Sequence, residues 1–395
     1  MKNEAFEILH SYNKKILFNY IRWNRNISRI ELAQKSGLSA TAVTRITNEF
    51  IKSGMVEEVG FCEVSTIGRK PIKLSICEDC MYAIGISIDS HSVSMGCVNL
   101  SGSVIAAIKD SGDQTLNPDL VVKTIRQMYD QLLTQLDDRI QDNIVGVGVS
   151  IPGLVSWPEG NTYLTPQLHW NPYPLREKIS DALGTNVLVD NNVKSIALAE
   201  GLFNNSLMVQ SQVVMDIGSG LGTAYIKDGC VFRGASGLFG ETGHIIIDEN
   251  GIECDCGRRG CLQTMICITG LEKQLNMPIQ QILENQNDEQ TKRVLDNAVH
   301  QLAKLVANIQ NIYNPDEVIL CGQLLKMWPE LYERVRKESR RLAWMPAKDR
   351  IYIRKLTDTN DDFQIASAAS ILLNDILMPS AIIQESAVNQ IQQRD

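Results

Sequence analysis

Three cysteines and one histidine are the residues of this chain whose types and spacing most clearly predict chemistry. The cysteines form the pattern C-x-C-x4-C, and the histidine precedes the first of them by ten positions: His244, Cys254, Cys256 and Cys261. Three thiolates and one imidazole can complete a closed tetrahedral site, which is typical of structural rather than catalytic zinc. Gly257 and Gly260 would let the backbone turn tightly around the metal. The alternative is a set of ordinary buried cysteines, but the close clustering favours zinc.

The same segment resembles the signature of the ROK family, which contains sugar kinases and sugar-responsive repressors. The resemblance rests on GETGH at 240–244 and CDCGRRGC at 254–261, and it extends from about Tyr82 to the C-terminus. It implies that Glu241 accepts hydrogen bonds from sugar hydroxyls and that His244 contacts the sugar as well as the metal. Gln263 stands where the family usually has a glutamate. Its amide can still bind a hydroxyl, as a neutral donor and acceptor.

The resemblance also implies where the rest of a sugar site would lie. Gly153 belongs to a Pro-Gly pair that shapes the sugar pocket in this family. The segment 189–193 aligns with the kinase motif V-E-N-D-V, which places Asn191 at a sugar-binding position and Asn192 at the position of the catalytic base. An amide has no useful proton affinity near neutral pH, so Asn192 can hold a hydroxyl but cannot deprotonate it.

Two of the three phosphate-binding motifs of ROK kinases are altered. The segment 87–91 stands where the family has D-x-G-G-T, and its side chains would crowd the close backbone approach that a phosphate loop requires. The glycine-rich segment 216–226 is retained, whereas 318–325 keeps one glycine where two are usual. We therefore predict that the chain is not an enzyme. A sugar kinase with an added DNA-binding domain is the alternative.

The N-terminal residues 13–53 predict three helices. The second follows Ser28, which forms a capping-box pattern with Glu31, and it ends at Gly37. The third begins after Ser39, so a very short turn separates the two, which is typical of a helix-turn-helix. The outer face of the third helix would enter a DNA major groove with Ala40, Thr41, Thr44 and Arg45. The alternative is a three-helix packing unit with a solvated face.

Two β-rich segments follow, 55–61 and 72–76, and a basic loop lies between them. This arrangement, together with S-R-x-E-L-A in the second helix and G-R-x-P in the loop, resembles the winged helix-turn-helix of ROK repressors. Arg69 and Lys70 are our candidates for minor-groove or phosphate contacts. A solvated basic turn is the alternative.

Charge is unevenly distributed along the chain. Residues 1–76 contain 12 Lys and Arg against 7 Asp and Glu, although the whole chain has a net charge of −8. An acidic body with a basic N-terminal module indicates that only the module meets a polyanion. We expect a cytoplasmic protein without membrane insertion, because the N-terminus does not resemble a signal peptide and no apolar stretch is long enough to span a bilayer.

Strand-like and helical runs alternate from Tyr82 onward, which predicts an α/β fold. The resemblance implies an actin/hexokinase-like body with two lobes. The expected domains are a winged helix-turn-helix at 1–76, an N-terminal lobe at 82–200, a C-terminal lobe with the zinc site at 201–370, and a helix at 371–395 for oligomerisation or lobe crossing.

These features predict a transcriptional repressor of carbohydrate metabolism or transport genes. Its partners would be a double-stranded DNA operator, a sugar or sugar-phosphate effector and further copies of itself in a dimer or tetramer. A protein effector is an alternative that the sequence does not distinguish. In a dimer, half-sites about 34–36 Å apart would fit one effector state better than the other.

Overall fold

The computed structural model describes residues 8–9, 11–24, 26–61, 71–112, 117–204, 210–344, 352–356 and 359–378. The chain forms two compact units that interleave in sequence. The first contains the residues up to 192, residues 198–207 and the chain from 364 onward, and the second contains 193–197 and 208–363. Helices α8 (Asn192–Phe203) and α15 (Asp361–Leu377) therefore each belong partly to both units.

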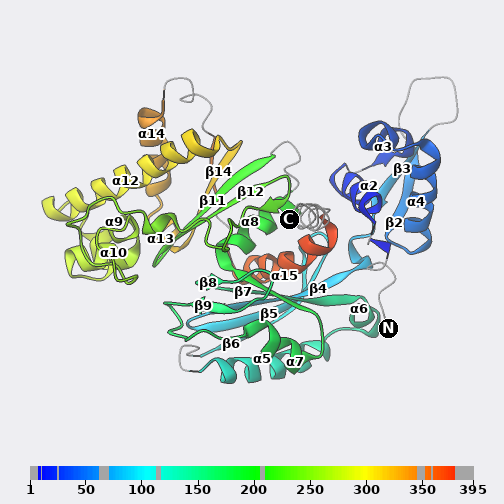
Figure 1. Cartoon of the computed structure of the whole chain (residues 1–395), viewed down its shortest axis with the longest axis horizontal. Helices are drawn as coiled ribbons and strands as arrows, with labels where there is room; N and C mark the ends of the chain where they lie inside the picture. Colours follow the sequence, from blue (N-terminus) through cyan, green and yellow to red (C-terminus); the bar gives the residue numbers. More distant parts are fainter. Residues whose placement is uncertain are drawn as a thin grey trace, which may run out of the picture. The chain divides into compact units, whose positions relative to one another are not determined.

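The N-terminal part of the first unit is a winged helix-turn-helix module (Figure 1). Its elements are α2 (Tyr12–Trp23), β1 (Ile27–Ser28), α3 (Arg29–Ser36), α4 (Ala40–Lys52), β2 (Val56–Phe61) and β3 (Ile72–Ile76). The three strands form an antiparallel sheet in the order β1-β3-β2. The module therefore has the three helices and two main wing strands that the sequence predicts.

The local signals in the sequence set the ends of these helices. The Ser28 side chain accepts a hydrogen bond from the Glu31 amide, and the Glu31 carboxylate accepts one from the Ser28 amide, so the predicted capping box is formed. Gly37 ends α3 in the left-handed region, at a φ of 69°. On α4, Phe50 is buried and meets Phe18 of α2 edge to face, with ring centroids 5.6 Å apart.

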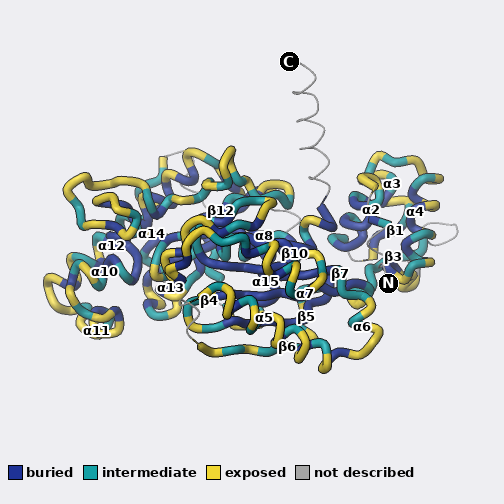
Figure 2. The backbone as a smooth tube through the Cα atoms, turned by 60° about the horizontal axis from the view of Figure 1, so that its bottom comes forward, coloured by how far each residue is buried: buried dark blue, intermediate teal, exposed yellow. Residues whose placement is uncertain are grey.

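The rest of the first unit is built on a five-stranded sheet with the order β10-β7-β4-β5-β6. Its strands are β4 (Tyr82–Asp89), β5 (Ser92–Asn99), β6 (Val104–Ser111), β7 (Ile144–Ile151) and β10 (Val187–Asn191). The elements around this sheet are η1 (Glu78–Cys80), α5 (Pro118–Leu133), α6 (Asp138–Asp142), β8 (Leu154–Val155), β9 (Thr162–Leu164) and α7 (Leu175–Leu183). Strands β4, β5 and β7 are buried along most of their length (Figure 2).

Helices cover both faces of this sheet, with α5 and α7 on one face and α15 on the other (Figure 1). Two glycines allow α15 to touch the strands directly. A Cβ on Gly85 would lie 1.9 Å from the Ile365 carbonyl oxygen, and one on Gly148 would lie 2.0 Å from that of Ala368. No side chain fits these gaps, so α15 rests on β4 and β7 through backbone contacts.

The second unit contains another five-stranded sheet, ordered β13-β12-β11-β14-β15. Its strands are β11 (Ser211–Ile217), β12 (Leu221–Lys227), β13 (Cys230–Val231), β14 (Glu317–Cys321) and β15 (Ile353–Lys355). Its helices are η2 (Thr242–His244), α9 (Gln263–Ile266), α10 (Ile268–Leu275), α11 (Ile279–Glu284), α12 (Glu289–Tyr313), α13 (Gln323–Met327) and α14 (Leu331–Leu342). A core of buried aliphatic side chains joins the sheet to α10, α12 and α14.

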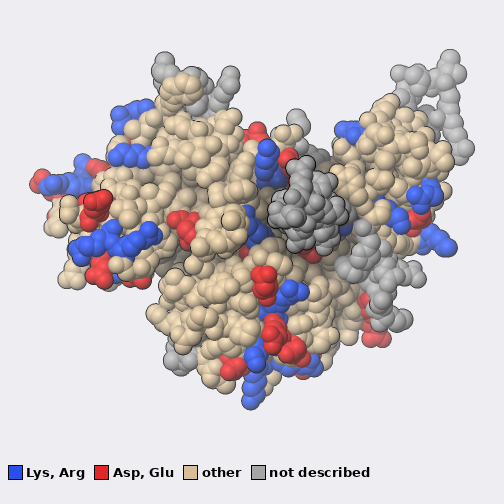
Figure 3. Space-filling model, viewed as in Figure 1, with Lys and Arg blue, Asp and Glu red and all other residues tan. Residues whose placement is uncertain are grey.

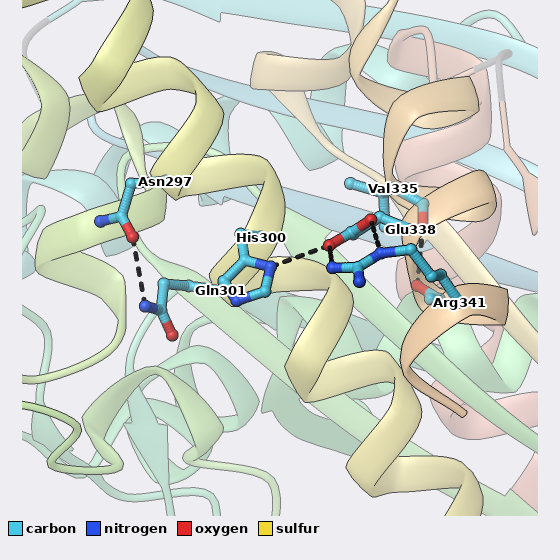
Figure 4. A network of polar contacts seen from close by, with 7 residues as sticks. Asn297, His300, Gln301, Val335, Glu338 and Arg341 are labelled. Carbon is cyan, nitrogen blue, oxygen red and sulfur yellow. Dashed lines mark hydrogen bonds and ion pairs between the residues drawn. The ribbon is translucent and has the colours of Figure 1, made fainter. Parts of the chain in front are cut away.

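A polar network links α12 to α14 beside this core (Figure 4). His300 Nδ1 lies 2.9 Å from Glu338 Oε1, and Arg341 Nε donates to Glu338 Oε2 at 2.8 Å. These contacts lower the pKa of Glu338 to about 2, with the Arg341 hydrogen bond as the largest cause and the His300 contact next. The carboxylate therefore holds two cationic or polar partners from different helices.

The observed elements agree with the predicted α/β fold and differ mainly at their ends. The β-rich segment predicted at 55–61 is observed as β2 from Val56, and the segment predicted at 72–76 is observed as β3 with the same bounds. Of the terminal helix expected at 371–395, residues 371–377 belong to α15, and residues 379–395 lie outside the described residues. Among the residues that are described, no helix has both the length and the apolar character needed to cross a membrane.

Candidate functional site

The structure brings the four predicted metal ligands together in the second unit. The ligand atoms of His244, Cys254, Cys256 and Cys261 all lie within 4.8 Å of one another. Cys256 Sγ is 3.6 Å from Cys261 Sγ, and Cys254 Sγ is 3.8 Å from His244 Nδ1. Ligand atoms of a tetrahedral zinc site lie about 3.5–3.8 Å apart when the metal bonds are 2.0–2.3 Å long. Two of the ligand–ligand distances match this geometry, and the four ligand atoms lie close enough together to form a tetrahedral metal site.

A short glycine-containing loop positions these ligands. Gly260 has a φ of 66°, and a Cβ there would lie 1.5 Å from the Asp248 carbonyl oxygen. Gly257 also has a positive φ, but no atom lies within 4 Å of the place where its Cβ would be. Isolated β-bridges at Ile246–Cys261 and Glu253–Arg259 close the loop. Gly260 is thus required by close packing, whereas Gly257 is required only by its backbone conformation.

The surroundings of the centre favour the metal-binding protonation states of His244 and Cys256 but not that of Cys261. Burial of His244, with a further contribution from Arg258, lowers its pKa and so favours the neutral imidazole. Burial raises the pKa of Cys256, but hydrogen bonds from the Arg258 backbone and side chain outweigh it and lower the value to about 7. Cys261 has no such compensation, and its burial raises its pKa to about 12. Without metal, Cys256 is thus the readiest thiolate of this pair.

The predicted sugar-binding residues of the second unit surround this metal centre. Glu241 directly precedes η2, and the residue as a whole is exposed. Partial burial of its carboxyl raises the pKa of Glu241, and the charge of Lys194 opposes this shift. Gln263 Nε2 lies 3.3 Å from Cys254 Sγ, so its amide donates toward a metal ligand. A carboxylate at this position could not make that contact, which is a role for Gln263 that the sequence did not reveal.

The predicted sugar-binding residues of the first unit form a separate cluster where β7 and β10 end. Asn191 Nδ2 donates to the Gly153 carbonyl oxygen at 2.8 Å, and Asn192 is the first residue of α8. Gly153 has a φ of 98°, and a Cβ there would lie 2.2 Å from the Leu164 carbonyl oxygen. The structure therefore brings Asn191 into contact with Gly153, whose backbone conformation and close packing require glycine, and Asn192 follows directly in the chain.

The turn that would carry the first phosphate loop is occupied by a carboxylate. β4 ends at Asp89, and Asp89 Oδ1 accepts hydrogen bonds from the Ser90 amide at 2.6 Å and from Ser90 Oγ at 3.2 Å. A phosphate loop uses such backbone amides to bind anionic oxygens. Here the Ser90 amide already donates to Asp89, and the Asp89 carboxylate places a negative charge on the turn that would have to bind a phosphate.

The candidate DNA-contacting face of α4 is open to solvent. Ala40, Thr41, Thr44 and Arg45 are all exposed, as the periodicity predicts. Arg45 is ion-paired with Glu49 at 2.7 Å, and Lys14 of α2 reaches the same carboxylate at 2.7 Å. Lys and Arg side chains are visible on the outer surface of this module (Figure 3). Arg69 and Lys70, the predicted wing contacts, lie outside the described residues.

One residue that holds α4 in place was not singled out by its sequence pattern. Arg29 donates to Thr47 Oγ1 at 3.0 Å and to Asn48 Oδ1 at 3.2 Å, both on α4, and forms an ion pair with Glu58 of β2 at 2.9 Å. It therefore connects α3, α4 and the wing. Its position at the start of the second helix was visible in the sequence, but its three acceptors come from other elements.

The chain is similar to curated repressors over most of its length. It is 27% identical over 333 residues to the xylose repressor of Bacillus subtilis, which covers 82% of this chain and 86% of that protein. It is 26% identical over 339 residues to the DNA-binding transcriptional dual regulator NagC of Escherichia coli, which covers 80% of this chain and 82% of that protein.

Solved structures show that the fold is shared with both regulators and kinases. A ROK family transcriptional regulator, a homologue of the E. coli MLC protein, matches with a TM-score of 0.76 at 23% identity, covering 93% of this chain and 98% of that one. A ROK hexokinase from Thermus thermophilus matches with a TM-score of 0.64 at 19% identity, covering 74% and 98%.

A winged helix-turn-helix joined to a body with the fold of sugar kinases defines a class of DNA-binding regulators. The winged helix-turn-helix DNA-binding profile matches residues 9–57. The ROK family profile matches residues 83–374. The chain belongs to the ROK family.

Proposed function

We propose that this chain is a transcriptional repressor whose binding to operator DNA is controlled by a sugar or sugar phosphate. The observation that carries the proposal is the exposed polar face of α4 on a winged helix-turn-helix, in a chain whose body belongs to the ROK family. The relatives named as xylose repressor and N-acetylglucosamine repressor support the same function. The regulated genes would serve carbohydrate metabolism or transport.

The test is binding of the purified protein to the upstream region of its own gene. Fluorescence anisotropy would be measured with D-xylose, D-glucose, N-acetylglucosamine and their phosphates. We expect tight, salt-sensitive binding that one of these compounds releases. Binding that none of them changes would favour control by a protein partner. Absence of binding both here and in selection from random duplexes would contradict the repressor function.

We further propose that Glu241, His244 and Gln263 in the second unit, and Gly153, Asn191 and Asn192 in the first, supply the sugar-binding groups. Glu241 and the asparagine amides are suited to hydroxyl groups, because each offers acceptor or donor atoms in fixed positions. Glu241→Gln should weaken the response to the effector while operator affinity without effector is unchanged. An unchanged effector response in this variant would remove Glu241 from the site.

We also propose that the chain has no kinase activity. Asn192 cannot act as a general base, and the Asp89 carboxylate occupies the turn where phosphate would bind. Asn192→Asp alone should therefore produce no ATP-dependent phosphorylation of any hexose in the panel. Robust turnover in that variant would contradict our interpretation of the β4–β5 turn.

The metal of the Cys3His centre is proposed to be a structural Zn²⁺. Its role would be to hold the loop that carries Glu241 and His244. Elemental analysis should find one zinc per chain, and Cys256→Ser should lose both the metal and the effector response. Retained zinc stoichiometry in this variant would remove Cys256 from the ligand set.

The active form is proposed to be a cytoplasmic homo-oligomer. A dimer would place two copies of α4 on half-sites one helical turn apart, which suits a palindromic operator. Light scattering of the DNA-bound protein would give the number of chains per duplex. One chain per duplex would contradict this part of the proposal.

A further inference from the structure

Three polar side chains of α2 are buried on one side of the helix. Lys15, Asn19 and Arg22 follow the spacing of one helical stripe, and their exposed fractions are 9%, 1% and 6%. Buried amines and guanidinium groups are costly unless they are hydrogen-bonded. We refer to Lys15, Asn19 and Arg22 as the α2 docking residues.

The hydrogen bonds that these three side chains donate to other described helices go to backbone carbonyls at the helix ends. Lys15 Nζ donates to Asp375 O at 3.2 Å and to Met378 O at 3.1 Å. Asn19 Nδ2 donates to Leu377 O at 2.8 Å, also at the end of α15. The last carbonyls of a helix lack intrahelical donors and carry partial negative charge, so an amine and an amide here satisfy the end of α15.

Arg22 makes the corresponding contact with α8. Its Nη1 donates to Leu202 O at 2.9 Å, in the last turn of that helix. Within the described part of the chain, Arg22 Nε and Nη2 are buried without a hydrogen-bond partner. Burial lowers the pKa of Arg22 to about 10, so the group stays cationic near neutral pH. A buried cation with only one hydrogen bond is a contact that can be broken at little cost, because water would satisfy the released nitrogens.

The two helices whose C-terminal ends the α2 docking residues bind, α8 and α15, are the helices that both units share. The chain passes between units near residues 192 and 197 within α8, near residue 207, and near residue 363 at the start of α15. α8 begins at Asn192, beside the proposed sugar-binding residue Asn191. A rearrangement of the body would therefore act on helices whose C-terminal ends are bound by the DNA-binding module.

We propose that Lys15, Asn19 and Arg22 are positioning residues that couple the DNA-binding module to α8 and α15. This inference rests on the proposed repressor function. The groups that these residues bind are backbone carbonyls at helix ends. The contact therefore depends on where those ends lie and not on a particular partner side chain. Because coupling is reciprocal, DNA bound at α4 must in turn alter the ends of α8 and α15.

The test is amide hydrogen exchange of the full chain, with and without a saturating duplex of its own upstream region. In the wild-type protein, DNA should change exchange by about fivefold or more in peptides covering the last turns of α8 and α15. In Lys15→Met the change should be less than about twofold, because the alkyl chain remains but the hydrogen bonds to α15 are lost.

Lys14→Met is the matched control, since it removes the same charge from the adjacent residue, which contacts Glu49 of α4 instead of α15. In Lys14→Met, DNA should change hydrogen exchange at these helix ends by the same amount as in the wild type. Asn19→Leu is a second variant of similar shape, in case Lys15→Met does not fold, and it should also abolish the change. If DNA changes hydrogen exchange at these helix ends as much in Lys15→Met or Asn19→Leu as in the wild type, the proposal is overturned.

Two further outcomes are distinguishable. DNA binding by the wild-type protein with no change at either helix end overturns the coupling alone. A wild-type protein that binds no DNA overturns the repressor function, and the coupling with it.

Discussion

Replacing Arg45 with alanine is the most direct test of the DNA-contacting face. The Arg45 side chain is 65% exposed, and its ion pair with Glu49 joins residues four apart on the same helix. Such exposed pairs contribute about 0.3–0.5 kcal/mol, so Arg45→Ala should leave the thermal stability of the protein nearly unchanged. A loss of DNA affinity in this variant would therefore reflect the interface and not unfolding.

The size of the loss depends on what Arg45 contacts. A bidentate contact with guanine discriminates by about 1–3 kcal/mol, which corresponds to an affinity loss of roughly 5- to 150-fold on the operator and less on unrelated DNA. A phosphate contact would instead weaken binding to all sequences and reduce the salt slope by about one. Arg45→Lys separates these cases, because lysine keeps the charge but not the bidentate geometry.

The assay is fluorescence anisotropy with operator and scrambled duplexes at several salt concentrations. Lys52→Ala, which removes an exposed cation from the last turn of α4, is the matched control and should lose less operator affinity than Arg45→Ala. Operator affinity that is unchanged in Arg45→Ala across the salt series would refute the assignment of this face of α4 to DNA.

Three other predictions concern packing and charge. Gly260→Ala should destabilise the metal loop and lower zinc affinity, because its Cβ would lie 1.5 Å from the Asp248 carbonyl oxygen; Gly257→Ala, with open space at its Cβ, should cost only about 1 kcal/mol. Equal zinc affinities in competition with a chelator would contradict this. Gly148→Ala should lower the free energy of unfolding by about 3 kcal/mol or more in denaturant titration, because α15 must move off β7; an unchanged midpoint would show that α15 can shift freely. Glu338→Gln should cost about 1 kcal/mol at neutral pH, since the group is surface-screened. The folded-state pKa of Glu338 is about 2, below its ordinary 4.5, so this stabilisation is complete above pH 4.5 and is lost as pH falls through about 2; a stability difference that persists at the lowest pH would contradict the ion-pair explanation.

Local signals in the sequence were sufficient for several elements. The capping box at Ser28 and Glu31, the break at Gly37 and the apolar spacing of α4 depend on residues within one or two turns, and the structure has each of them. The clustering of the four candidate metal ligands was also predictable, since three of them lie within eight positions of one another and a short loop keeps them close. The sugar-side residues were identified through the family resemblance, and their roles remain predictions.

Other features depended on contacts that no local pattern encodes. Asp89 could be seen to replace a phosphate-loop residue, but only the folded turn shows its carboxylate bonded to the Ser90 amide. Arg29 finds its acceptors on α4 and β2, which the chain reaches only after folding.

The clearest case is the face of α2. Lys15, Asn19 and Arg22 are polar residues of ordinary type, and their partners lie 180 or more positions away along the chain. Those partners are backbone carbonyls, which every residue possesses, so no side-chain pattern could have indicated them. Residue type and spacing decided which helices form and which side chains can bind a metal, because both depend on nearby residues. Tertiary packing alone decided which helix ends face α2, because that depends on how distant segments meet.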